Sequence, residues 1–357
     1  MIAGLLLRIT LILFALSSAL LLLVNGAAPT LGYGPQISYI VQSADAGYDL
    51  MLYDVGRSLT LPLTRHGRVY LLMGPVWSPD GRHVAYFEQV AAGESRLAVT
   101  TIGGQTRLLA EPVQLGSDPA WSSDSRRIAV VINSAVVLVD RVTMAPVPGF
   151  PRVPGRNPAW SPTGEYLAYF GGDLDEGVRA LDPVSGQAGL LIDIEAVLRE
   201  AGAAPFPVLP TLLAWSPDGG SVFIGSGAQF AVSPPGIIYD TRSARAQVIE
   251  PAWSADWSGT GRALVYVGRE EQNAPLGVYR YDRDIGVVQW LAFGDSPSWS
   301  PDDRWILFRQ PLAAGRAWAL MRPDGRERRD VLPEDARRVS MLQGERGIFF
   351  LAWRPGS

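Results

Sequence analysis

The chain has 357 residues, a formal net charge of −4 and no cysteine. The lack of cysteine excludes disulfides, thiolate catalysis and Cys-ligated zinc, and the lack of a net positive charge argues against nucleic acid as a partner. With 47% hydrophobic residues the chain can bury a sizeable core, as one large domain or two medium ones.

Residues 1–24 are apolar apart from one Arg, one Gly and three hydroxyl residues. A helix of roughly 20 apolar residues spans a bilayer. We therefore expect a hydrophobic helix here, either a signal anchor or a signal peptide. Asn25 and Pro29 make the following positions poor for signal peptidase, which favours the anchor.

Arg8 is the one charged residue of this segment, and no other basic residue precedes Arg57. Positive charge stays on the cytoplasmic side of a membrane helix. The rest of the chain is therefore expected to lie outside the cytoplasm, in the periplasm or at the cell surface. Residues 25–36, rich in Gly, Ala and Pro, are predicted to be a linker.

The stretch from Pro75 to Phe87, Pro-Val-Trp-Ser-Pro-Asp-Gly-Arg-His-Val-Ala-Tyr-Phe, contains a unit that recurs along the chain. Its Ser-Pro-Asp-Gly part predicts a type I turn, with Pro at the second position and Gly at the fourth. The residues that follow, Val84 to Phe87, are apolar on both faces, as in a strand that is covered on both sides. The unit is therefore predicted to be a tight hairpin within stacked sheets.

Seven copies of the unit are marked by Trp77, Trp121, Trp160, Trp215, Trp257, Trp299 and Trp353. Their spacings of 44, 39, 55, 42, 42 and 54 residues are close to the length of a four-stranded propeller blade. We therefore predict an all-β fold, a seven-bladed β-propeller over residues 37–357. The regular position of the Trp side chains predicts that they pack between blades.

The last copy has only four residues after Trp353 and can supply only one strand. The first strands of the chain, from Ile37 onward, match a repeat that lacks its Trp strand. We predict that Ile348–Trp353 pairs with these N-terminal strands and closes the ring. Closure removes the exposed sheet edges of an open ring.

The Trp-Ser-Pro-Asp-Gly unit, the apolar strand after it and a later strand ending in Asp resemble the TolB-like propeller repeat. The strand-ending aspartates are Asp54, Asp140, Asp182, Asp240 and Asp282. The resemblance covers roughly residues 37–357. It implies the fold. TolB itself has six blades and an N-terminal α/β domain, so its role in an outer-membrane complex is not transferred to this chain.

Two long spacings contain segments outside the repeat. Leu190–Ala201 is predicted to be a short amphipathic helix ended by Gly202, which either caps a blade edge or binds a partner. The second segment, Arg322–Arg338, mixes Arg with Asp and Glu and is expected to be a solvated loop, with a polyanion site as the alternative.

The chain offers few residues for catalysis or metal binding. Its two histidines, His66 and His83, are expected to be surface loop residues, and no Gly-x-Ser-x-Gly elbow occurs. The carboxylates of Asp173, Asp175 and Glu176 suffice only for a partial Ca²⁺ site. We therefore predict no catalytic residue, no metal and no cofactor, and enzymatic activity stays undecided, with a non-enzyme favoured.

A ligand site, if there is one, is expected at a mouth of the central channel. Residues three and four positions before each Trp begin the innermost strands and should approach that mouth. The polar residues at these positions include Asp118, Arg156, Asn157 and Asp295. They are either a binding surface or side chains that hydrate the channel entrance.

These features predict a membrane-tethered, extracytoplasmic propeller that binds a protein partner or senses a small ligand without catalysis. The alternative is a hydrolase or lyase that uses channel-mouth carboxylates such as Asp118 and Asp295, with or without a divalent cation. A purely structural subunit of an envelope complex is a third possibility.

Overall fold

The structure is a computed structural model that describes residues 35–356, apart from 44–46, 72, 116, 173–176, 207–208, 227–233, 270, 272–273, 313–314 and 332–350. The predicted helix at 1–24, nearly all of the linker, Asp173, Asp175 and Glu176, and Ile348 to Phe350 lie outside the described residues. Within the described part of the chain, no helix is long and apolar enough to cross a bilayer.

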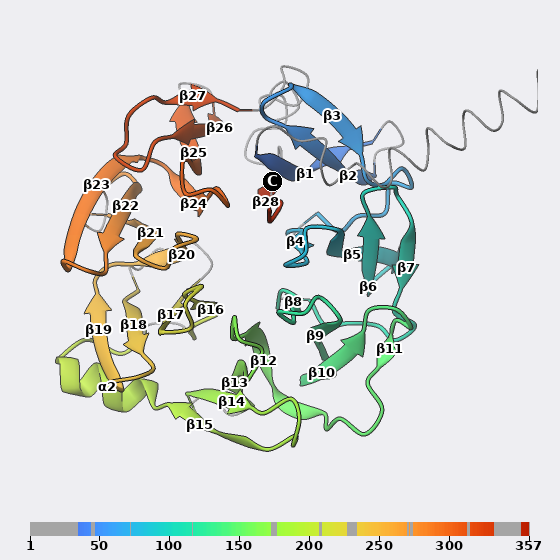
Figure 1. Cartoon of the computed structure of the whole chain (residues 1–357), viewed down its shortest axis with the longest axis horizontal. Coiled ribbons are helices and arrows are strands. Elements are labelled where there is room, and N and C mark those ends of the chain that lie inside the picture. Colours follow the sequence, from blue (N-terminus) through green and yellow to red (C-terminus); the bar gives the residue numbers. More distant parts are fainter. Residues whose placement is uncertain are drawn as a thin grey trace, which may run out of the picture.

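Antiparallel sheets are arranged in a ring around a common centre (Figure 1). Five of them have four strands each. From the innermost strand outward, the first sheet contains β28 (Leu351–Trp353), β1 (Gln36–Gln42), β2 (Tyr48–Asp54) and β3 (Leu59–Pro62), and the second contains β4 (Val76–Trp77), β5 (His83–Ala91), β6 (Glu94–Thr101) and β7 (Thr106–Leu108). The third contains β16 (Leu212–Trp215), β17 (Ser221–Gly225), β18 (Gly236–Asp240) and β19 (Arg245–Ile249), and the fourth contains β20 (Trp253–Trp257), β21 (Ala263–Gly268), β22 (Gly277–Asp282) and β23 (Val287–Phe293). The fifth contains β24 (Asp295–Trp299), β25 (Ile306–Leu312), β26 (Gly315–Met321) and β27 (Arg329–Asp330). The predicted all-β propeller is confirmed.

The remaining strands form one eight-stranded sheet. It contains β8 (Ala120–Trp121), β9 (Arg127–Ile132), β10 (Ala135–Asp140), β11 (Ala145–Pro146), β12 (Val153–Trp160), β13 (Leu167–Gly171), β14 (Val178–Leu181) and β15 (Ala188–Ile192). The predicted count of seven separate blades is therefore wrong, because five four-stranded blades are present. The physical reason is β12, whose first residues Val153 and Pro154 pair with Val136 and Ala135 of β10 and make the sheet continuous.

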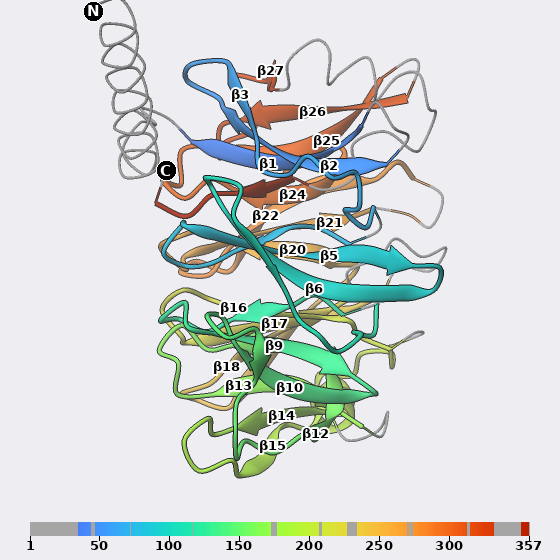
Figure 2. The same ribbon diagram turned by 90° about the vertical axis from the view of Figure 1, so that its right-hand side faces the viewer.

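The core lies between neighbouring sheets. One apolar cluster joins Phe87 of β5 and Leu97 of β6 to Ile128 of β9 and Val137 of β10, all of them buried. Strand β5 buries Val84 through Phe87 completely or nearly so, as its unbroken apolar sequence predicts. Figure 2 shows the sheets stacked edge-on, so that each covers the face of the next.

The described part of the closing strand confirms the predicted closure of the ring. β28 pairs antiparallel with β1, with Ile37 opposite Trp353 and Tyr39 opposite Leu351. The inner strand of this blade therefore comes from one end of the propeller and its other three strands from the opposite end. No edge of β1 is left open at the centre of the ring.

Arg354 fastens this seam. It stands where the six other copies have Ser, and it is 3% exposed. Its Nε donates to the carbonyl of Gly81 at 2.7 Å, its Nη1 donates to Oε1 of Gln36, and its backbone N–H donates to the carbonyl of Gln36 at 2.8 Å. One side chain thus connects the last repeat to both the first strand and the first turn.

The repeated Trp side chains connect neighbouring inner strands, and their predicted packing role is confirmed. In four copies, the indole N–H donates to the carbonyl of the residue before the Trp of the preceding copy: Trp121 to Val76, Trp215 to Ala159, Trp257 to Ala214 and Trp353 to Ser298. Trp77 donates instead to the hydroxyl of Ser38 at 2.9 Å. The indole N–H of Trp299 is buried and has no partner among the described residues.

A single helix, α2 (Ile194–Ala201), occurs in the described residues. Asp193 caps it by accepting from the N–H of Ala196, and Gly202 ends it in a left-handed conformation. The predicted helix is confirmed over these residues, whereas residues 190–192 belong to β15. The helix packs beside β19 on the outer rim (Figure 1), as expected for a blade-edge cap.

The Trp hydrogen bonds generate a matched pair of substitutions. Trp257→Phe removes a buried N–H and leaves the carbonyl of Ala214 without this donor, whereas Trp299→Phe removes an N–H that is already unpaired. We expect Trp257→Phe to lower the free energy of unfolding by about 1 kcal/mol more than Trp299→Phe. Urea unfolding followed by fluorescence measures both, and equal losses would contradict this account of the Trp contacts.

The seam generates a second prediction. Arg354→Ala removes two side-chain hydrogen bonds in a buried position, and we expect the free energy of unfolding to fall by roughly 2–3 kcal/mol. Arg304→Ala is the control, because Arg304 is 75% exposed and lies 3.9 Å from its carboxylate partner. Thermal unfolding should show a clear loss for the first variant only; two equally small losses would show that Arg354 does not hold the ring closed.

Candidate functional site

The predicted channel mouth corresponds to the starts of the innermost strands. In β12, β20 and β24 the pairing register shifts two to four residues before the Trp, between Arg156 and Ala159, Trp253 and Asp256, and Asp295 and Ser298. At each shift one residue has a positive φ, namely Asn157, Ser254 and Ser296. Such bulges bend a strand and redirect its side chains. The polar residues predicted for the mouth are therefore set by irregular backbone.

Two of the four predicted mouth residues, Arg156 and Asn157, contact each other, and Asn157 also contacts the residue directly before Asp118. The backbone N–H of Asn157 donates to the hydroxyl of Ser117 at 2.9 Å, which links β12 to the residue directly before Asp118. Arg156 donates to the side chain of Asn157 at 3.3 Å and to the carbonyl of Pro210 at 2.6 Å. We call Asp118, Arg156 and Asn157 the mouth cluster. It places a carboxylate, a guanidinium and an amide on neighbouring inner strands.

Asp118 is the acidic group of this cluster. Its side chain is exposed, and no described residue donates a hydrogen bond to it. Partial desolvation by the surrounding chain raises the pKa of Asp118 to about 6. A carboxyl group of this kind exchanges its proton near neutral pH and is available to a ligand.

Arg156 is held in place by its neighbours. Besides its two hydrogen bonds, its guanidinium lies 4.7 Å from the centre of the Phe170 ring, a cation–π contact. Burial lowers the pKa of Arg156, which still leaves it charged at neutral pH. The positive charge at the mouth therefore has a fixed position.

Asp295 is apart from the mouth cluster and is already occupied. It is 2% exposed, and its two oxygens accept from Arg309 and Arg316, each at 2.7 Å. Ser296 donates to it as well, at 2.9 Å. Its strand, β24, lies between β20 and β28 around the ring and not beside β8 or β12 (Figure 1). The structure therefore does not bring Asp118 and Asp295 together.

Sequence reasoning missed Asp256 in the channel wall. It is the one carboxylate at the position directly before the repeated Trp, where the other copies have Val76, Ala120, Ala159, Ala214, Ser298 and Ala352. Its Oδ2 accepts from the backbone N–H of Trp299 at 2.7 Å and from the hydroxyl of Ser298 at 2.9 Å. Desolvation raises its pKa to about 6 despite these hydrogen bonds. Comparing one position across all copies could have found it.

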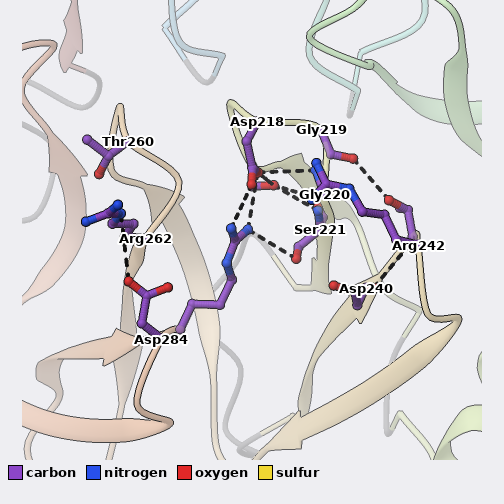
Figure 3. A network of polar contacts seen from close by, with 12 residues as sticks. Asp218, Gly219, Gly220, Ser221, Asp240, Arg242, Thr260, Arg262 and Asp284 are labelled. Carbon is purple, nitrogen blue, oxygen red and sulfur yellow. Dashed lines mark hydrogen bonds and ion pairs between the residues drawn. The ribbon is translucent and has the colours of Figure 1, made fainter.

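The opposite face carries the Ser-Pro-Asp-Gly turns, and its charges are structural. Figure 3 shows Asp218 at the centre of a polar network that crosses from one blade to the next. Arg283 donates to both oxygens of Asp218, at 3.2 and 2.7 Å, and these hydrogen bonds hold the pKa of that carboxyl far below its usual value. Asp218 on this face is thus paired with Arg283, whereas no described residue donates a hydrogen bond to Asp118 at the predicted mouth.

Neither histidine has the setting of a general base. Nε2 of His66 lies 2.9 Å from the buried Glu88 and its Nδ1 accepts from the backbone of Arg68, so both ring nitrogens are engaged. His83 was expected in a surface loop but begins β5, where burial and the nearby Arg141 lower its pKa. Among the described residues, no group of three His, Asp or Glu side chains could hold a metal ion.

Asp256 makes the stability depend on pH. The pKa of Asp256 is about 6 in the folded chain against an ordinary value of 3.8, so the folded chain holds this proton more tightly than the unfolded chain does. The resulting contribution to the free energy of unfolding is fully present below pH 3.8 and is lost as the pH rises through 6. Asn cannot titrate but can accept the same two hydrogen bonds. We expect Asp256→Asn to gain on the order of 2 kcal/mol relative to the wild type between pH 4 and pH 7.5.

Urea unfolding at both pH values measures this gain. Asp284→Asn is the control, because Asp284 lies on the turn face with a 57% exposed side chain. A difference between Asp256→Asn and the wild type that stays the same at both pH values would contradict the raised pKa.

Comparisons with known proteins agree with this architecture. No protein-family model matches the chain. A protein of Agrobacterium fabrum, described as uncharacterized, is 29% identical over 116 residues, which are 31% of this chain and 39% of that protein. The match thus spans well under two thirds of this relative.

Solved propellers are similar over most of the chain. TolB from Acinetobacter baumannii has a TM-score of 0.51 and 21% identity, with 90% of this chain and 83% of that chain covered. An oligogalacturonate lyase from Vibrio parahaemolyticus has a TM-score of 0.59 and 14% identity, covering 82% and 85%. The periplasmic gluconolactonase of Pseudomonas aeruginosa has a TM-score of 0.57 and 16% identity, covering 91% and 100%. The predicted resemblance is confirmed at the level of fold: the chain is a β-propeller of the kind to which TolB belongs.

Proposed function

We propose that the chain is a non-enzymatic β-propeller, tethered to a membrane outside the cytoplasm, that binds a protein partner at the mouth cluster of Asp118, Arg156 and Asn157. The observation that supports the binding role is the contrast between Asp118 and the other acidic groups of the ring. Asp256 and Asp295 accept hydrogen bonds from the chain itself, whereas no described residue donates one to the exposed Asp118.

The mouth cluster has the composition of a recognition surface. It combines a carboxylate, a fixed guanidinium and an amide within two neighbouring strands. Paired positive and negative groups with complementary partners give specificity to a protein interface. Arg156, held by Pro210 and Phe170, is positioned before any partner binds, which reduces the entropy lost on binding. A polar loop of a partner protein fits these groups, and a small polar ligand is the other occupant of the same chemistry.

The tether is part of the proposal and rests on the sequence. Residues 1–24 are long and apolar enough for a membrane helix, and Arg8 favours an orientation that places the propeller outside the cytoplasm. The linker expected over residues 25–36 reaches the start of β1 at Gln36. A propeller attached in this way would meet partners close to the membrane surface.

A hydrolase or lyase is the second candidate, and one observation favours it. The raised pKa of Asp118 suits a group that transfers protons near neutral pH. Solved propellers with a similar fold include a lyase and a gluconolactonase. Against it, Asp295 is held between Arg309 and Arg316 away from Asp118, so the proposed pair of mouth carboxylates does not form.

The test is a comparative capture from detergent-solubilised native membranes with the full chain as bait. Three baits are used: the wild type, Asp118→Lys, and Asp284→Lys, which makes the same charge change on the turn face. We expect a stoichiometric partner to be retained by the wild type and by Asp284→Lys and to fall about tenfold with Asp118→Lys, because like charges now meet at the interface. Mass spectrometry gives the readout.

Melting temperatures confirm that both variants fold. A partner retained equally by all three baits would contradict the assignment of the mouth cluster. An empty capture, together with turnover of a substrate that is lost in Asp118→Asn, would establish the enzymatic candidate in its place.

A further inference from the structure

The outer rim of the ring contains one strand unlike the others. β23, Val287–Phe293, is seven residues long and forms the outermost strand of its blade (Figure 1). It contains no charged residue and no Pro, and the chain has no charge from Ile285 to Gly294. Its exposed apolar side chains are Val287 at 51%, Val288 at 46%, Trp290 at 44% and Phe293 at 52%.

The other outermost strands are protected in ways that β23 is not. β3 ends in Pro62, β7 has three residues and a central Arg107, and β11 and β27 have two residues each. β19 begins with Arg245 and packs beside α2, and the five-residue β15 leads straight into that helix. Short length, charge, Pro and a covering helix are the usual means of preventing edge pairing. β23 has none of them.

Part of the β23 edge is already covered by the chain. Nη2 of Arg328 donates to the carbonyl of Leu291 at 2.7 Å, and Gly325 lies against the same carbonyl. The open part is therefore the first half of the strand, from Val287 to Trp290. Any strand that adds to this edge must pair there.

We propose that β23 is a self-association surface, at which two copies of the chain pair their β23 strands antiparallel about a two-fold axis at Val288. This pairing places Val288 opposite Val288 of the copy and Val287 opposite Gln289. Trp290 then lies beside the turn residue Gly286 of the copy, which has no side chain to oppose the indole. It brings no charge into the interface. A two-fold pair also closes on itself, so both edges are satisfied and no fibre grows.

The uncharged sequence of β23 fits a second copy of β23 better than it fits a charged strand. The edge offers only backbone hydrogen bonds and uncharged side chains, so a charged strand would bury charges without partners. A copy of β23 supplies the same uncharged run, and Trp290 and Val288 lie on the face that the pair would share. The inference is independent of the mouth cluster, which is on the inner strands.

Cysteine crosslinking tests the register directly, because the chain has no native cysteine. Directly opposed residues of an antiparallel pair have Cα atoms about 4.5–5.5 Å apart, within the range that a disulfide spans. In the full chain in detergent, Val288→Cys should form a disulfide-linked dimer under mild oxidation. Adding Trp290→Lys should lower that yield about tenfold, while melting temperatures show that each variant folds.

Two matched controls exclude random collision. Gln289→Cys changes the adjacent exposed residue, which faces Val287 of the copy and not its own cysteine. Leu190→Cys changes a 56% exposed residue on β15, an outermost strand of another sheet. Both should crosslink weakly. Equal yields for all three cysteines, as a dimer formed only through the N-terminal segment would give, or no dimer in any of them, would overturn the proposal.

Discussion

The fold depends on contacts between neighbouring inner strands, because each sheet is a small unit that cannot bury its own faces. The repeated Trp supplies this contact, with its ring in the gap between sheets and its N–H on the strand before it. Where Trp299 lacks such a bond, the carboxylate of Asp256 holds the Trp299 backbone instead. The indole N–H of Trp160 is likewise buried without a partner among the described residues, so the polar contacts beside the apolar packing differ from one junction to the next.

This dependence explains why the mouth is chemically uneven. An inner strand must both reach its neighbour and curve around a hole, and three of them do so with a bulge. The bulges place different side chains at equivalent positions: Arg156 over an aromatic ring, a buried Trp253 under Arg269, and Asp295 between two arginines. A repeated backbone thus carries different side chains at equivalent positions, and among the described residues no hydrogen bond is donated to Asp118.

The sequence predicted what repeats and missed what does not. The Trp spacing and the incomplete first repeat sufficed for the propeller and for its closure by β28, because both follow from a local unit and from counting strands. The eight-stranded sheet depends on how far β12 extends before its Trp, which no turn signal marks. The clamp on Asp295 comes from Arg309 and Arg316, on the second and third strands of the blade, and only the strand register brings these residues to it. The contact between Asn157 and Ser117 joins corresponding parts of neighbouring repeats, which is why Asp118 and Asn157 could be expected in the same region; their role as a site stays a prediction.

The seam has a consequence for how the chain is made. Gln36 and Arg354 are 318 residues apart, yet they lie side by side in one blade. During synthesis β1 leaves the ribosome long before its inner partner exists, so its edge stays available for pairing while the other sheets assemble. Contacts of such long sequence separation are slow to form. Protection of that edge until β28 arrives is therefore a more pressing need for this chain than for a propeller whose blades are each built from continuous sequence.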